Sequence, residues 1–232
     1  AESSASQERV APVSVEVLEA GSAPVQVDGG IRIRGGFSRQ DSNPKHPFHL
    51  YFRNSCGDSE LRYPLFDTEG TDRFKRLDLR ATQGRSWHWS HSSSATFNRD
   101  VFGREIQRDM GQPYSRSRHV HVLINGIYWG LFQTQERVDR HFAESYFGGN
   151  DADYDVMKTR TRSHRVEALD GTPDAWTALY DAAVAGFAND ADYLAVQSLV
   201  DIDNLIDYML AIFFTGSTDG PVSLGANVPK NF

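Results

Sequence analysis

The sequence has very little cysteine, no long apolar run and no excess of positive charge. Its one cysteine, Cys56, cannot form an intrachain disulfide or a cysteine-based metal site. The most apolar run, residues 208–214, is far shorter than the about 20 residues of a membrane-spanning helix, so no membrane insertion is expected. Lysine and arginine number 24 against 31 aspartates and glutamates, and this net charge of −7 argues against nucleic acid as the main partner.

The 232 residues, of which 39% are hydrophobic, suffice for a buried core in one large domain or two small ones. The chain begins at Ala1 rather than at methionine, and no closing element precedes Phe232. We therefore expect a fragment, and a signal peptide could have been removed or could lie upstream. The compartment stays open, with an extracellular, periplasmic or cell-surface location weakly favoured.

Strand patterns dominate before residue 145 and helix patterns after it. Apolar alternation predicts strands over 13–18, 25–33, 48–52, 74–79, 119–124 and 127–133. Asn125-Gly126 predicts a hairpin between the last two, and Asp28-Gly29-Gly30 predicts a turn or bulge within the second. Helical spacing predicts helices over 97–110, 138–147, 173–187 and 203–214. This segregation indicates an α+β fold, with a strand-rich lobe over 1–145 that contains one helix and the start of a helical lobe over 146–232.

A glycine-containing segment after the second strand has the composition of an anion-binding loop. Gly35 and Gly36 would let backbone N–H groups approach a phosphate, while Arg34 and Ser38 add charge and a hydroxyl donor. Lys45 follows at the start of the next strand. An ordinary hairpin turn explains the same glycines, so the residues leave both interpretations open.

Two acidic positions also suit phosphoryl-transfer chemistry. Glu105, on the first predicted helix, could hold a phosphate-binding lysine by an ion pair, or it could be a solvated surface charge. Asp219 follows the most hydrophobic helix and precedes Asn227 and Asn231, an order typical of a kinase base and metal ligand. The alternative for Asp219 is an ordinary Asp-Gly-Pro turn.

Two other patterns resemble metal sites but are incomplete. Asp151, Asp153 and Asp155 alternate like the start of a calcium loop, but the sixth-position glycine and twelfth-position glutamate are missing. His119 and His121 share one face of a strand without an evident third ligand. We therefore expect neither pattern to bind metal.

Taken together, four segments in order resemble the motifs of the CotH kinase family, which is named for a bacterial spore-coat protein. The segments are Arg32-Ile-Arg-Gly-Gly-Phe-Ser-Arg39 with Pro44-Lys45-His-Pro-Phe48, Arg99-Asp-Val-Phe-Gly-Arg-Glu105, Ile124-Asn-Gly-Ile-Tyr-Trp-Gly-Leu-Phe132 with Glu136, and Asn204-Leu-Ile-Asp-Tyr208 with Asp219. The resemblance implies a distant kinase-like fold that binds ATP with Mg²⁺ or Mn²⁺ and phosphorylates serine or threonine of a protein.

The resemblance also implies roles for individual residues. Asp219 corresponds to the catalytic aspartate and Asn231 to a metal-binding asparagine, with Asn227 as a rival because the Asp-to-Asn spacing is longer than usual in the family. Lys45 and the loop 34–38 would face the phosphates. Glu105 would pair with the lysine, and Glu136 would lie at a hinge beside the adenine pocket.

The family pattern is not matched throughout. His46 stands where a second lysine is common, and the family's second metal-binding aspartate would lie beyond Phe232, so this fragment is expected to be inactive. Some relatives act as cell-surface ligands, which makes a non-catalytic adhesion or structural module the alternative. The charge of −7 is a hint of a basic protein substrate, and the resemblance implies that this substrate contains serine or threonine.

Overall fold

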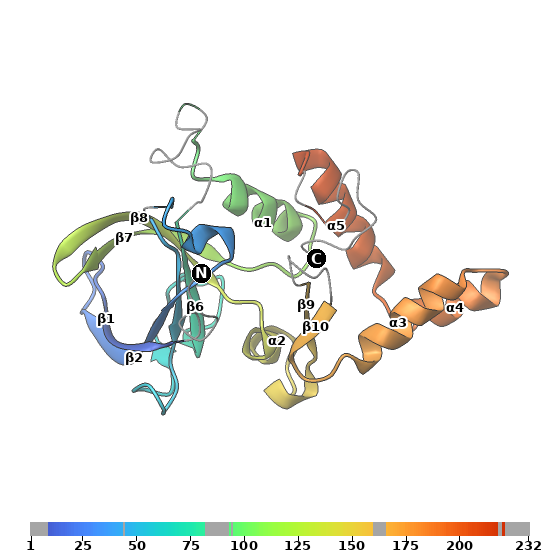
Figure 1. The fold of residues 1–232 in the computed structure, drawn as a ribbon, viewed down its shortest axis with the longest axis horizontal. Coiled ribbons are helices and arrows are strands. Elements are labelled where there is room, and N and C mark those ends of the chain that lie inside the picture. Colours follow the sequence, from blue (N-terminus) through green and yellow to red (C-terminus); the bar gives the residue numbers. More distant parts are fainter. Residues whose placement is uncertain are drawn as a thin grey trace. The chain divides into compact units, whose positions relative to one another are not determined.

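The computed structural model describes residues 9–43, 45–81, 93, 95–159, 166–217 and 220 (Figure 1). The chain divides into two compact units. The first, which we call the sheet unit, comprises residues 1–102 and 115–137, and the second, the helical unit, comprises 103–114 and 138–232.

The sheet unit is built on one antiparallel sheet of six strands. In spatial order these are β1 (Ala11–Val17), β2 (Val25–Ile33), β3 (Phe48–Tyr51), β6 (Arg76–Arg80), β8 (Ile127–Glu136) and β7 (Ser117–Ile124). The short strands β4 (Leu61–Arg62) and β5 (Arg73–Phe74) form a separate pair. The six-stranded sheet is visibly curved in Figure 1.

The strand register gives this sheet one apolar and one polar face. Directly paired residues share a face, because side chains alternate along each strand. The apolar face packs into two clusters of buried side chains: Val27, Leu50, Phe52, Leu61, Tyr63, Leu65, Phe66, Phe74 and Leu77 in one, and Phe48, Ala81 and Phe132 in the other. On the opposite face, the pairing aligns Arg32, His49, Asp78, Gln135 and Ser117 across five strands.

The predicted interruption at Asp28-Gly29-Gly30 is wrong. These residues continue β2 and pair in register with Ser14, Val13 and Pro12 of β1. The glycines are required by close packing instead of by a turn. A Cβ on Gly29 would lie 2.7 Å from the Tyr51 carbonyl oxygen, and one on Gly30 would lie 2.4 Å from the Val10 side chain.

The predicted hairpin at Asn125-Gly126 is confirmed. Asn125 and Gly126 both have positive φ, 51° and 79°, as a type I′ turn demands. The turn joins β7 to β8, whose pairing extends from Ile124–Ile127 to Ser117–Gln135 with one irregularity at Val122/Leu123. This long hairpin forms one edge of the sheet.

The helical unit follows β8. Its elements are α2 (Arg140–Phe147), the 3₁₀ turn η4 (Asp151–Asp153), the hairpin β9 (Val156–Thr159) and β10 (Val166–Asp170), α3 (Asp174–Ala185), α4 (Asp190–Gln197) and α5 (Ile202–Thr215). Helix α1 (Arg99–Asp109) begins in the sheet unit and continues into this one. The segment after α1 is tied to α5, since Gln112 hydrogen-bonds Asp207 at 2.6 Å and Asn204 at 2.8 Å.

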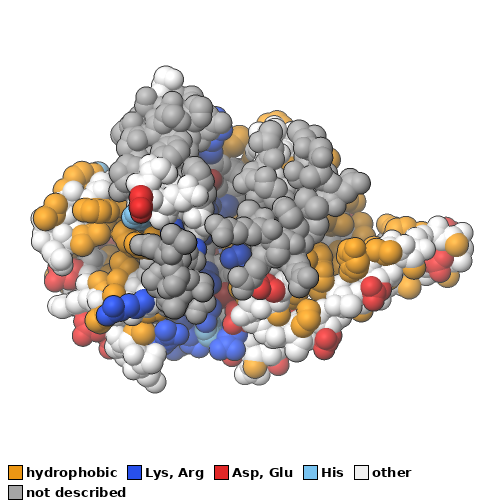
Figure 2. All heavy atoms as spheres, in the orientation of Figure 1, with side chains coloured by type: hydrophobic (Ala, Val, Ile, Leu, Met, Phe, Trp, Pro, Cys, Tyr) orange, Lys and Arg blue, Asp and Glu red, His pale blue; other side chains and the backbone are white. Residues whose placement is uncertain are grey.

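The order of elements, with strands first and helices after, confirms the predicted α+β class. Among the described residues, no helix combines the length and the apolarity needed to cross a membrane. Hydrophobic side chains are nevertheless exposed along the helices (Figure 2), among them Tyr180 and Val184 on α3 and Tyr193 and Leu194 on α4.

Candidate functional site

Lys45 is a partly buried cation held against the edge of the β7–β8 hairpin. Its ammonium donates to the carbonyl oxygen of Leu131, and Nζ lies 4.4 Å from the ring centroid of Phe132 and 5.7 Å from that of Phe97. Burial lowers the pKa of Lys45, with no charged group contributing. No carboxylate within the described part of the chain pairs with it. Lys45 is therefore a positioned positive charge without a protein counter-ion in that part.

Gly130 makes room for this lysine, a role that the sequence did not reveal. It has φ of +122°, which side chains rarely allow. A Cβ at Gly130 would also come within 3.3 Å of both Cε and Nζ of Lys45. The second glycine of the hairpin segment thus fixes where the ammonium can lie.

A buried carboxylate organises the polar face of the sheet. Asp78, only 5% exposed at its side chain, pairs with Arg34 (Nη1–Oδ2 2.7 Å) and accepts a hydrogen bond from Nδ1 of His49. Nη1 of Arg137 lies 3.2 Å from the same His49 nitrogen. Since the carboxylate is the stronger acceptor, we assign the Nδ1 proton to the bond with Asp78, and Arg137 acts there through its charge.

The pKa values within this cluster follow from burial and charge. Burial opposes ionisation of Asp78, but the hydrogen bond from His49 and the charge of Arg34 outweigh it and lower the pKa of Asp78. The pKa of His49 is lowered, because burial, together with the charges of Arg137 and Arg34, outweighs the raising effect of Asp78. At neutral pH the cluster therefore consists of an ionised aspartate, a neutral histidine and two arginines.

Further arginines surround Tyr51 on the same face. The guanidinium carbons of Arg53, Arg32 and Arg137 lie 5.3, 5.5 and 6.0 Å from the centroid of its ring. Figure 2 shows Lys, Arg and His side chains gathered on the visible face of the sheet unit. Planar guanidinium groups bind phosphate and carboxylate through paired hydrogen bonds, so this face suits an anionic ligand.

The glycine loop after β2 folds upon itself. Gly35 has φ of +94°, and a Cβ there would lie 1.8 Å from Oγ of Ser38. The Ser38 hydroxyl donates to the Arg34 carbonyl oxygen at 3.2 Å, while Nδ1 of His46 lies 3.0 Å from the Ser38 carbonyl oxygen. Gly36 precedes the 3₁₀ turn η2 (Phe37–Arg39), and a Cβ on Gly36 would meet nothing within 4 Å.

The structure does not bring Arg34 and Lys45 into contact. Arg34 pairs with Asp78 on the polar face, whereas Lys45 lies against Phe132, which belongs to an apolar cluster. Both residues lie at the end of the sheet where β2 finishes and β3 begins. They therefore offer two separate positive charges instead of a single cation pair.

With this geometry established, the chain can be compared with known proteins. Residues 31–228 match the family model described as CotH kinase protein. The chain belongs to the CotH kinase family. A comparison with curated proteins found no match.

The two glutamates that the CotH motifs single out have different surroundings. Glu136 is buried at the end of β8, where Oε2 accepts from the Arg116 backbone N–H at 2.8 Å and pairs with its guanidinium at 3.3 Å. The Ser115 hydroxyl donates to its carbonyl oxygen. Glu136 thus fixes Ser115 and Arg116, the two residues that precede β7. The sheet unit ends one residue after Glu136, at Arg137. Its place beside an adenine pocket stays a prediction.

Glu105 is exposed on α1, in the part of that helix that belongs to the helical unit. The pairing of Glu105 with Lys45 is therefore also still a prediction.

The predicted CotH catalytic and metal-binding residues, Asp219, Asn227 and Asn231, lie outside the described residues. The helix that leads to them is described: α5 ends at Gly216, a left-handed cap with φ of 60°. Gly220 packs against α5, since a Cβ there would lie 2.9 Å from Cγ2 of Ile212.

The residues of the two incomplete metal patterns have separate partners. Asp153 accepts from the backbone N–H of Asn150 and Asp155 from that of Thr172, whereas Asp151 pairs with a histidine of α2. The ring of His121 lies 2.9 Å from the Tyr128 hydroxyl. The ring of His119 lies 3.3 Å from the carbonyl oxygen of Phe97.

Proposed function

We propose that this CotH family member is a protein kinase that transfers the γ-phosphoryl group of ATP to serine or threonine of a protein. The observation that carries the proposal is Lys45, a partly buried ammonium without a carboxylate partner in the described chain. It stands where the family motif has its phosphate-binding lysine. A phosphate would supply the counter-charge that the protein does not supply in that part of the chain.

Donors on the described residues support the proposed binding of a nucleotide's phosphates. The Lys45 ammonium donates one hydrogen bond to Leu131, which leaves two N–H donors for an oxyanion. Arg34 is oriented by Asp78 and keeps further guanidinium donors beyond that pair. ATP would supply the phosphoryl group, ADP would be the leaving group, and Lys45 would hold and orient the phosphate oxygens. Arg34, on the other face of the sheet, would offer a separate contact for an anion.

The remaining roles rest on the family motifs. Asp219 would orient the substrate hydroxyl and accept its proton, and Asn231 or Asn227 would help to hold Mg²⁺ or Mn²⁺. With a net charge of −7, the chain would attract a basic, serine-containing protein as its substrate.

A thermal-shift experiment tests nucleotide binding. We expect ATP with Mg²⁺ or Mn²⁺ to raise the melting temperature of the wild type, and Lys45→Met to abolish that rise. The lowered pKa of Lys45 shows that burial of its charge is unfavourable in the folded protein. Lys45→Met removes that charge and should therefore not itself lower the melting temperature. Lys75→Met is the matched control, since this exposed lysine of the same unit lies outside the proposed site.

Transfer itself is measured on the full-length gene product, with radiolabelled ATP and a basic, serine-rich protein. Asp219→Asn should remove transfer and leave binding. No thermal shift with any nucleotide and metal would overturn the proposal and support a non-catalytic surface module. Binding that Lys45→Met leaves intact would overturn the role of Lys45.

A further inference from the structure

A second cluster of ligand-type side chains lies in the helical unit, on α2 and the turn that follows it. Asp139 caps α2, its carboxylate accepting from the backbone N–H groups of His141 (3.0 Å) and Phe142 (3.3 Å). This cap fixes the first turn of the helix. His141 and Glu144 are three residues apart and therefore project from the same side of α2.

The chain then reverses and returns a third side chain to the same place. Gly148 and Gly149 have φ of 82° and 71°, values that suit glycine at a reversal. Asn150 caps η4 by reciprocal hydrogen bonds with Asp153, and the Tyr154 hydroxyl donates to the Gly148 carbonyl oxygen at 2.7 Å. This closed turn places Asp151, the first residue of η4, beside His141.

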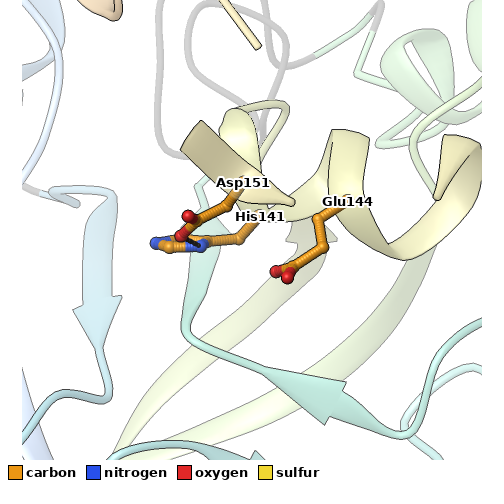
Figure 3. Close-up of side chains that lie close together, drawn as sticks. All are labelled: His141, Glu144 and Asp151. Atoms are coloured by element: carbon orange, nitrogen blue, oxygen red, sulfur yellow. Dashed lines mark ion pairs between the residues drawn. The ribbon is translucent and has the colours of Figure 1, made fainter. Parts of the chain in front are cut away.

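Figure 3 shows the resulting arrangement, with the His141 ring against the Asp151 carboxylate and Glu144 approaching from one turn further along α2. Nδ1 of His141 lies 2.9 Å from Oδ2 of Asp151. One ligand atom from each of the three residues lies within 4.8 Å of the other two. All three side chains are partly buried, so they are held in place but can be reached from solvent.

We propose that His141, Glu144 and Asp151 bind a divalent transition-metal ion such as Zn²⁺. One imidazole nitrogen and two carboxylate oxygens form a donor set that Zn²⁺ accepts, with a fourth position left for water. Ligand atoms around a tetrahedral ion lie about 3.4 Å apart, so only small side-chain rotations separate the observed cluster from a coordinating one. The bound ion ties α2 to η4 and needs no nucleotide.

A neighbouring cation sets a limit on this site. Nε of Arg140 lies 3.6 Å from Oδ2 of Asp151 and 3.7 Å from Oδ1 of Asp170. A metal ion would therefore compete with Arg140 and with the His141 pair for the same carboxylate. Asp170 can keep Arg140 occupied when Asp151 turns to the metal, so the positive charge does not block the site.

The test is a zinc titration of the tag-free protein without nucleotide, followed by calorimetry or a chromophoric zinc indicator. We expect one Zn²⁺ per chain and much weaker binding of Mg²⁺, which prefers sites made only of oxygen ligands. Glu144→Gln is the decisive variant, because it removes one ligand charge and leaves both the Asp139 cap and the His141–Asp151 pair. It should weaken Zn²⁺ binding by at least about tenfold, as should His141→Ala.

His121→Ala is the matched control. It also removes one histidine side chain, but from the sheet unit, and should therefore leave zinc binding unchanged. Circular dichroism of each variant checks that it is folded. If His141→Ala is not folded, the result for Glu144→Gln alone decides the proposal. The proposal fails if the wild type takes up no Zn²⁺, if Glu144→Gln binds as tightly, or if His121→Ala weakens binding equally. Because the titration contains no nucleotide, this result is independent of the kinase proposal.

Discussion

At the scale of single residues, Gly130 connects the hairpin to the proposed phosphate site. Substituting alanine would strain a backbone with φ of +122° and push a Cβ against the end of Lys45. We expect Gly130→Ala to lower the free energy of unfolding by about 1–3 kcal/mol and to reduce the ATP-induced rise in melting temperature. Urea denaturation and thermal shift measure the two effects, and an undiminished ATP shift would show that Gly130 does not position Lys45.

His49 predicts how stability depends on pH. Its pKa is lowered from 6.5, mainly by burial. Below about pH 6.5, His49 therefore binds a proton more readily in the unfolded chain than in the folded chain. The contribution of His49 therefore makes stability fall as the pH falls from 7.5 to 5.5. The pKa of Asp78, lowered from 3.8, gives a loss of the same sign, but only at more acidic pH.

Glutamine at position 49 can keep a hydrogen bond to Asp78 without titrating. We expect the melting temperature of His49→Gln to fall less between pH 7.5 and 5.5 than that of the wild type. The difference between the two curves isolates His49 from the other histidines. Parallel curves would contradict the assignment of a lowered pKa to this residue.

At the scale of elements, α1 contains a glycine whose substitution by alanine should raise stability, in contrast to Gly130→Ala. Gly103 lies within the helix, and a Cβ there would meet nothing within 4 Å. Gly103→Ala should therefore raise the free energy of unfolding by about 0.5–1 kcal/mol, because alanine loses less backbone entropy in a helix. Urea denaturation beside Gly130→Ala gives the comparison, and a lower stability for Gly103→Ala would contradict the open surroundings of this position.

Strands β1, β2, β3, β6, β7 and β8 and helices α1, α2, α3 and α5 lie within a few residues of the ranges predicted from the sequence. The sequence analysis predicts no element at β4, β5, β9, β10 or α4. Such short segments carry little periodicity, and their conformation depends on tertiary packing. The glycines of β2 were misread because close approach and turn formation require the same residue type.

The site was predictable only in part for a related reason. Lys45 and Arg34 could be named from local motifs, but Asp78, His49 and Arg137 come together only through the register of β3, β6 and the end of β8. The alternation along each strand specifies the face on which a side chain lies. It does not specify which distant segments become neighbouring strands, and that pairing brings Asp78 beside His49. The separation of Lys45 from Arg34 likewise follows from the two faces of the sheet, not from their closeness in the chain.

At the scale of the whole molecule, net charge and local charge have opposite signs. The chain carries −7 overall, yet Arg32, Arg53 and Arg137 surround one tyrosine on the polar face of the sheet. Beyond about 10 Å at moderate salt, little of the field of exposed charges remains, so a ligand at this face experiences the arginines more than the net charge. A binding preference for anions there and for basic substrates elsewhere is therefore compatible with one sequence.

The division of the chain into two units also governs how the gene could be cut and recombined. The chain passes from one unit to the other at residues 102–103, 114–115 and 137–138, so neither unit is a continuous stretch of sequence. No single truncation point would release either unit intact. Isolating the sheet unit would require deleting residues 103–114 and connecting Phe102 to Ser115 through a short linker. Domain shuffling at one breakpoint would leave both units incomplete.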